Sequence, residues 1–186
     1  MKVCGVILWG LVLIAPADRQ PAVVSADTGE RYIAVSVDRN GALAIRKADG
    51  RTVAVYKRRD QTTFDKPRLS PDRTAVAAQA MYPNCCTSYD IPLRLVVYED
   101  GREHWFRSGE GLPIFWWRFE DGGRRVAYGS STVHSGCGTN YELRDVRSET
   151  LIDSVLVPED FVSCSWPPGA KAVRIPAWAK RLIDAR

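Results

Sequence analysis

Residues 69–78 have the sequence Leu-Ser-Pro-Asp-Arg-Thr-Ala-Val-Ala-Ala, and residues 119–128 have the sequence Phe-Glu-Asp-Gly-Gly-Arg-Arg-Val-Ala-Tyr. In both segments a polar turn leads into a short strand of aliphatic residues and alanine. Val76 and Val126 occupy the same place in the two segments, so the chain repeats after about 50 residues. A repeat of this length, made of short strands and turns, is typical of stacked β-sheet blades.

A second unit repeats with a similar spacing and predicts the hairpin that completes each blade. Residues 43–51 match residues 95–102, and residues 143–150 match them more loosely. Alternating apolar residues between turn signals predict groups of three, four, four and two strands. The expected strands are Arg31–Val37, Ala42–Lys47, Thr52–Tyr56, Lys66–Leu69, Thr74–Met81, Leu93–Glu99, Arg102–Arg107, Pro113–Phe119, Arg124–Ser131, Tyr141–Val146, Thr150–Leu156, Phe161–Trp166 and Lys171–Ile175. A short C-terminal helix is expected over Ala177–Arg186, with Trp178 and Leu182 on its inner face.

These residues resemble the TolB-like (WD40-like) β-propeller repeat, whose blade motif is a Ser-Pro-Asp-Gly turn followed by an aliphatic-alanine-aromatic strand. Residues 70–78 keep this motif with Arg73 in place of the turn glycine, and residues 121–128 keep Asp-Gly-Gly and Val-Ala-Tyr. The resemblance covers residues 31–175 and implies an all-β, propeller-like stack of three to four antiparallel β-meander blades. Closed propellers typically have four to eight blades. The blades are therefore expected to form an incomplete ring, a very small ring, or half of a homodimer that closes the stack.

The N-terminus has the pattern of an export signal, because Lys2 precedes an apolar run from Val3 to Ile14 and small residues follow at Ala15 and Ala17. We expect residues 1–17 to be a cleaved signal peptide and residues 18–186 to form one domain, periplasmic or secreted, in a bacterial envelope. No later segment is long and apolar enough to predict a membrane span. The net charge of +4 is mild and the basic residues are scattered, which argues against nucleic acid as a partner.

Four cysteines follow the expected signal peptide: Cys85, Cys86, Cys137 and Cys164. An even number in an exported protein favours structural disulfides, and three pairings are open. The repeat places the Cys85-Cys86 pair and Cys137 in equivalent long loops, so a bridge between these loops would link neighbouring blades. Two alternatives use the same loops. Cys85, Cys86, His134 and Cys137 could ligate zinc or copper(I), or a Cys85–Cys86 disulfide could act as a redox switch.

The loops Tyr82–Asp90 and Thr132–Thr139 are the expected working face, with Tyr82, Tyr89, His134 and Tyr141 as candidate binding residues. Strand alternation places Phe115, Trp117 and Phe119 on one side, either as core or as an aromatic platform for a sugar or peptide that Trp166 joins. A Gly-x-Ser-x-Gly nucleophile motif is absent, and no cofactor motif stands out. The sequence thus favours a non-enzymatic module that binds another envelope protein or a peptide, and a metal or thiol redox protein is the alternative.

Overall fold

The computed structural model describes residues 31–85, 87–133, 138–158 and 173–185. Their strands form three antiparallel sheets, each a meander in which sequence neighbours pair. Sheet A contains β1 (Tyr32–Val37), β2 (Leu43–Lys47) and β3 (Thr52–Val55); sheet B contains β4 (Thr63–Leu69), β5 (Ala75–Tyr82), β6 (Ile91–Glu99) and β7 (Arg102–Phe106); sheet C contains β8 (Ile114–Glu120), β9 (Arg125–Ser130), β10 (Gly138–Asp145) and β11 (Leu151–Pro158). A 3-10 turn, η1 (Asp121–Gly123), joins β8 to β9, and the helix α1 (Ala177–Ile183) follows sheet C.

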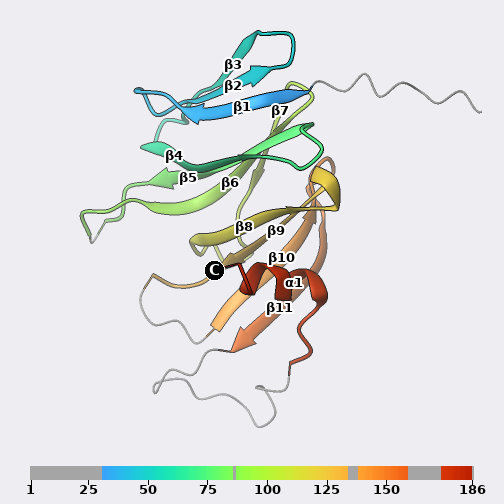
Figure 1. Ribbon diagram of the computed structural model, residues 1–186. Coiled ribbons are helices and arrows are strands. Elements are labelled where there is room, and N and C mark those ends of the chain that lie inside the picture. Colours follow the sequence, from blue (N-terminus) through green and yellow to red (C-terminus); the bar gives the residue numbers. More distant parts are fainter. Residues whose placement is uncertain (1–30, 86, 134–137, 159–172, 186) are drawn as a thin grey trace, which may run out of the picture.

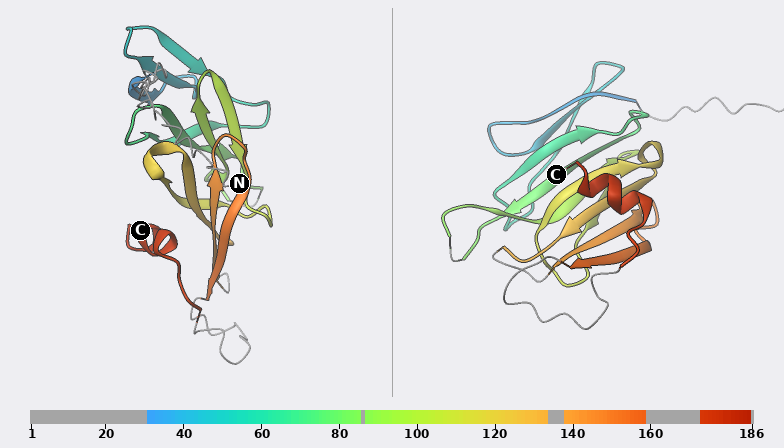
Figure 2. Two further views of the ribbon diagram at one scale, coloured as in Figure 1. Left: turned by 90° about the vertical axis from the view of Figure 1, so that its right-hand side faces the viewer. Right: turned by 60° about the horizontal axis from the view of Figure 1, so that its bottom comes forward.

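The three sheets stack in chain order, and α1 lies against the free face of sheet C (Figures 1 and 2). This arrangement confirms the predicted all-β, propeller-like fold with a short C-terminal helix. The described blades form an open stack, which matches the incomplete-ring alternative. Trp178 and Leu182 are both buried against sheet C, as their spacing predicted.

Strand β5 explains why the blades pack so closely. Its alternating side chains divide between two cores: Ala75 and Ala77 face sheet C, whereas Val76, Ala78 and Ala80 face sheet A. All five are fully buried. Because the side chain of alanine is a single methyl group, the larger residues of the neighbouring sheets can pack close to the backbone of β5.

The two repeated turns also pack on each other, which links the first motif to the second. The hydroxyl of Ser70 donates to Asp72 Oδ1 at 2.6 Å and accepts from the amide of Ala75 at 2.9 Å. Although partial burial acts to raise it, hydrogen bonds from Ser70 and Thr74 hold the pKa of Asp72 below its ordinary value. The Asp72 amide donates to the carbonyl of Gly122, and a Cβ on Gly123 would lie 2.8 Å from that of Ser70.

Several strand predictions need correction. A bulge in β1 between Tyr32 and Ala34 turns Tyr32 into the core and leaves Ile33 43% exposed, so Ile33 does not share the buried face of Val35 and Val37. Strands β4 and β10 begin three residues earlier than expected. The predicted strand Phe161–Trp166 and the predicted signal peptide lie outside the described residues, and residues 173–175 are not in a strand. No helix in the described part of the chain has the length and apolar character of a membrane span.

Replacing Gly123 by alanine is expected to destabilise the protein by about 2–4 kcal/mol, because the φ of +147° strains any L side chain and the new Cβ meets Ser70. Gly50→Ala is the matched control. Gly50 also has a positive φ, +87°, but no atom lies within 4 Å of its Cβ position, so its cost is about 1–2 kcal/mol. Urea unfolding measures the loss in the free energy of unfolding for both variants. Equal losses would contradict the close packing of Gly123 against Ser70.

Trp178→Ala is expected to reduce the free energy of unfolding by about 3–5 kcal/mol, because it empties the centre of the contact between α1 and sheet C. It also removes the hydrogen bond from the indole Nε1 to Asp153 Oδ2, which is 2.8 Å long. Lys180→Ala on the exposed side of the same helix should change stability by less than about 0.5 kcal/mol. Thermal unfolding compares the two, and a small loss for Trp178→Ala would show that α1 does not stabilise sheet C.

Candidate functional site

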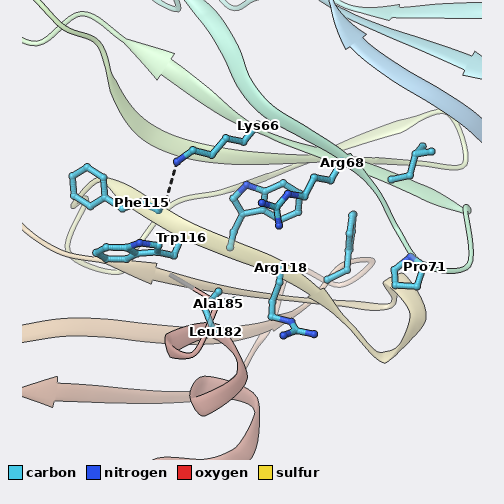
Figure 3. Close-up of a pocket in the computed structure, with 11 residues that line it drawn as sticks. Lys66, Arg68, Pro71, Phe115, Trp116, Arg118, Leu182 and Ala185 are labelled. Atoms are coloured by element: carbon cyan, nitrogen blue, oxygen red, sulfur yellow. Dashed lines mark hydrogen bonds between the residues drawn. The ribbon is translucent and has the colours of Figure 1, made fainter.

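A groove of about 480 Å³ lies where the first strands of sheets B and C approach α1 (Figure 3). β4 forms one wall, β8 runs through the middle and the end of α1 forms the other wall. The lining residues are Lys66, Arg68, Leu69 and Pro71 from β4 and its turn, Phe115, Trp116, Trp117, Arg118 and Phe119 from β8, and Leu182 and Ala185 from the C-terminal segment. Its size is within the range of small-molecule and peptide-side-chain pockets.

Bulges at matching places in β4 and β8 aim side chains into this groove. The β4 register shifts between Asp65 and Arg68, where Lys66 has a φ of +49°, and the β8 register shifts between Ile114 and Trp116. Lys66 and Phe115 therefore occupy related positions in the two blades, and the Lys66 ammonium donates to the Phe115 carbonyl at 3.4 Å. Bulges re-aim side chains and are frequent beside functional sites.

Gln79 supports the β8 bulge from sheet B. This residue is 1% exposed, and its amide nitrogen donates to the carbonyls of both Ile114 and Phe115, the latter at 3.1 Å. A bulge leaves carbonyl groups without their ladder partners, and buried carbonyls need a donor. Gln79 therefore stabilises the position from which Phe115 enters the groove.

The aromatic side chains of β8 divide into core and groove residues, which corrects the predicted alternation. Trp117 and Phe119 are buried between sheets B and C, with ring centroids 5.6 Å apart. Because the bulge removes Phe115 from their face, Phe115 lies in the groove beside Trp116, at 5.5 Å and an interplanar angle of 58°. The predicted core role is thus seen for Trp117 and Phe119, whereas a platform for a sugar or peptide stays a prediction. Trp166 lies outside the described residues.

The groove has an excess of positive charge, which the sequence did not reveal. Arg118 pairs with Glu120, and Glu120 also pairs with Arg181 of α1. By contrast, neither Lys66 nor Arg68 has a carboxylate within ion-pair distance in the described part of the chain. The guanidinium of Arg68 lies 5.6 Å from the centre of the Trp117 ring. One sequence feature did point to the irregular edge of β4, because a proline within a strand, here Pro67, marks an edge strand or a bulge.

The candidate binding tyrosines are not gathered on one surface. Tyr89 is 50% exposed in the β5–β6 loop, and Tyr82 is half-buried against the core between sheets A and B. Tyr141 is fully buried beneath α1, so it is not part of a binding surface in this structure. His134 lies outside the described residues. The described ends of both predicted loops do lie on the same side of the stack, at the left of Figure 1.

The cysteine predictions stay open. Cys85 is exposed in the β5–β6 loop, while Cys86, Cys137 and Cys164 lie outside the described residues, so no disulfide pairing is tested. Within the described residues no group of three or more His, Cys, Asp or Glu side chains is placed to hold a metal ion. Most of the proposed ligand set, His134 included, falls in segments that the structure does not describe.

A second hollow, of about 350 Å³, lies between β7 and the β10–β11 turn, with a buried carboxylate nearby. Glu142 is 2% exposed and accepts hydrogen bonds from the Tyr128 hydroxyl, the Gly109 amide, the Asn140 amide and the Arg144 guanidinium. Burial, together with the charge of Glu142, raises the pKa of Tyr128 well above its ordinary value. Since both carboxylate oxygens are satisfied by the protein, Glu142 has a structural role.

Gln79→Ala is expected to cost about 1–3 kcal/mol, because it leaves the bulge carbonyls of β8 without their buried donor. Lys66→Ala removes a contact to the same bulge from the exposed side and should cost less than about 0.5 kcal/mol. Urea unfolding measures stability, and near-ultraviolet circular dichroism reports the positions of Phe115 and Trp116. An unchanged aromatic spectrum in Gln79→Ala would contradict the supporting role.

No family model matches the chain, and a search of curated proteins found no relative. Among solved structures, the chain is similar to hydrazine synthase of Kuenenia stuttgartiensis, at 13% identity and a TM-score of 0.41, over 72% of this chain and 35% of that one. It is also similar to uncomplexed acylaminoacyl peptidase of Pyrococcus horikoshii, at 15% identity and a TM-score of 0.41, over 67% of this chain and 22% of that one. The chain thus spans about a third or less of the length of these proteins.

Proposed function

We propose that this protein is an exported, non-enzymatic binding module of the TolB-like repeat class. Its recognition surface is the groove between β4, β8 and α1, and its partner is another envelope protein or a peptide. The observation that carries this proposal is the pair of uncompensated cations, Lys66 and Arg68, next to the half-buried rings of Phe115 and Trp116. Cations beside partly exposed aromatic rings are a common composition of binding surfaces.

The chemistry of the lining supports binding over catalysis. The groove offers the Lys66 ammonium and the Arg68 guanidinium without carboxylate partners, two half-buried rings and the exposed Ala185. General acid–base and nucleophilic catalysis use His, Asp, Glu, Ser, Cys, Tyr or Lys, and of these only Lys66 lines the groove among the described residues. Anionic and apolar groups of a partner would fit this surface.

The rigidity of the scaffold also supports a binding role. The groove is built on strands of two blades, and the bulge that presents Phe115 is supported by Gln79. Arg118 donates to the carbonyl of Arg181 at 3.2 Å, and Glu120 pairs with both arginines, so β8 and α1 are tied together. A preformed surface loses little conformational entropy when a partner binds.

The double variant Lys66→Glu/Arg68→Glu tests this function on immobilised panels of peptides and oligosaccharides. Wild-type protein should bind a subset of the probes, and the variant should bind them at least about tenfold more weakly because attraction becomes repulsion. Arg39→Glu/Arg46→Glu is the matched control, since both arginines are exposed on sheet A and the change in net charge is equal. Bound probes should be recovered with unchanged mass, as a non-enzymatic module requires.

Two outcomes would contradict the proposal. If wild-type protein binds no probe at millimolar concentration, the groove is not a recognition surface. If the groove variant and the sheet A control lose the same affinity, the effect comes from net charge and not from the groove.

A further inference from the structure

We propose that the groove takes an extended acidic peptide, which lies along the open edge of β8 as an added strand. This inference rests on the proposed function and names the chemistry of its partner. It follows from three features of the described residues: the edge of β8, the difference between the two walls of the groove, and the charge of Lys66 and Arg68.

β8 is the terminal strand of sheet C, and its strand neighbour there is β9. From Trp116 to Glu120 the pairing with β9 is regular, with no further register shift. A regular edge strand presents a row of backbone donors and acceptors on its other side, which is the template for another strand. The groove runs along this side of β8, so there is space for a peptide at this edge (Figure 3).

The neighbouring edge is protected, which sets β8 apart. β4 is the terminal strand of sheet B, but it contains Pro67, a bulge and the charged Lys66. Proline, bulges and lysine are the means by which native proteins prevent strand addition. β8 also has a bulge, at Phe115, but residues 116–120 beyond it have no proline, three of the five are aromatic, and the two charged residues pair with each other. A strand of this composition at an open edge is suited to pairing with a partner.

The two walls require different side chains from the added strand. Lys66 and Arg68 line the β4 side, whereas Trp116 and Leu182 line the α1 side together with Ala185. Successive side chains of a strand point to opposite faces. An added strand would therefore alternate acidic residues, facing Lys66 and Arg68, with apolar residues facing Trp116 and the exposed Ala185.

The electrostatic argument selects acidic residues for the first of these faces. Arg118 is already neutralised by Glu120, but Lys66 and Arg68 have no carboxylate within ion-pair distance in the described part of the chain. Carboxylates of the partner would supply the missing counter-charges. An interaction of this kind is screened by salt, whereas the backbone pairing to β8 is much less so.

The experiment uses the full chain and an acetylated, amidated octapeptide of alternating Asp and Leu, measured by isothermal titration calorimetry. Four peptides serve as controls: alternating Asn and Leu, Asp and Leu in two blocks, and the alternating Asp-Leu peptide N-methylated either on every Asp or on every Leu. The alternating acidic peptide should bind at least about tenfold more tightly than the Asn and block peptides. One of the two N-methylated peptides should fail to bind and the other should bind normally. Amides of alternate residues point to opposite edges of a strand, and only one edge of the added strand pairs with β8.

Hydrogen exchange and a protein variant give readouts that do not depend on peptide design. Amides within residues 116–120 should exchange at least about tenfold more slowly in the complex, whereas those of β1 should not change. Lys66→Gln/Arg68→Gln should weaken binding of the acidic peptide and leave binding of the Asn peptide unchanged. Strand addition would be overturned if both N-methylated peptides bind equally well, or if the amide hydrogen exchange of residues 116–120 does not change in the complex.

The peptide and groove proposals can fail separately. If an acidic oligosaccharide such as oligogalacturonate binds in a Lys66- and Arg68-dependent way and the acidic peptides do not, the peptide inference is wrong and the groove keeps its binding function. If neither kind of probe binds, both proposals are wrong.

Discussion

Each sheet of this protein must bury apolar side chains, and the way in which each face is covered explains the rest of the structure. Sheet B is apolar on both faces and lies between sheets A and C. Sheet C is also apolar on both faces, and α1 covers the one that sheet B leaves open. The outer face of sheet A instead has small or polar residues, including Ala34, Ser36, Arg46 and Thr52. A stack bounded by a polar face and a helix is comparable to repeat proteins with terminal caps, although Leu151, Ile152 and Leu156 of β11 stay exposed.

The same stacking creates the groove. Since the blades repeat after about 50 residues, β4 and β8 are their equivalent first strands and lie next to each other at the open edges of sheets B and C. Bulges in related positions then direct Lys66 and Phe115 to one place. The cap contributes as well, because α1 supplies Leu182 and, through Arg181 and Glu120, a tie to β8. Scaffold and candidate site are therefore consequences of one packing arrangement.

Predictions from turn motifs and from the alternation of apolar residues were correct where no bulge or contact with a distant segment changed the local structure. The eleven described strands and α1 all correspond to expected elements, with ends shifted by a few residues. The errors have physical causes. The bulges at Ile33 and Phe115 reverse the alternation, and no residue pattern announces them clearly. Tyr141 was expected near a binding loop, but the early start of β10 and the cover provided by α1 bury it. The cysteine predictions fall mostly outside the described residues and stay predictions.

The sequence by itself determined the class of fold, because a repeated turn and strand motif requires identical local structures, and alternating apolar residues require stacked sheets. It also determined the helix that ends the described stack, through the spacing of Trp178 and Leu182. Only the tertiary structure decided where the candidate site lies. Whether Lys66 and Arg68 are paired with acids, and whether Phe115 faces core or groove, depends on residues from other blades and from α1. Such contacts between segments far apart in the chain leave no periodic signal in the sequence.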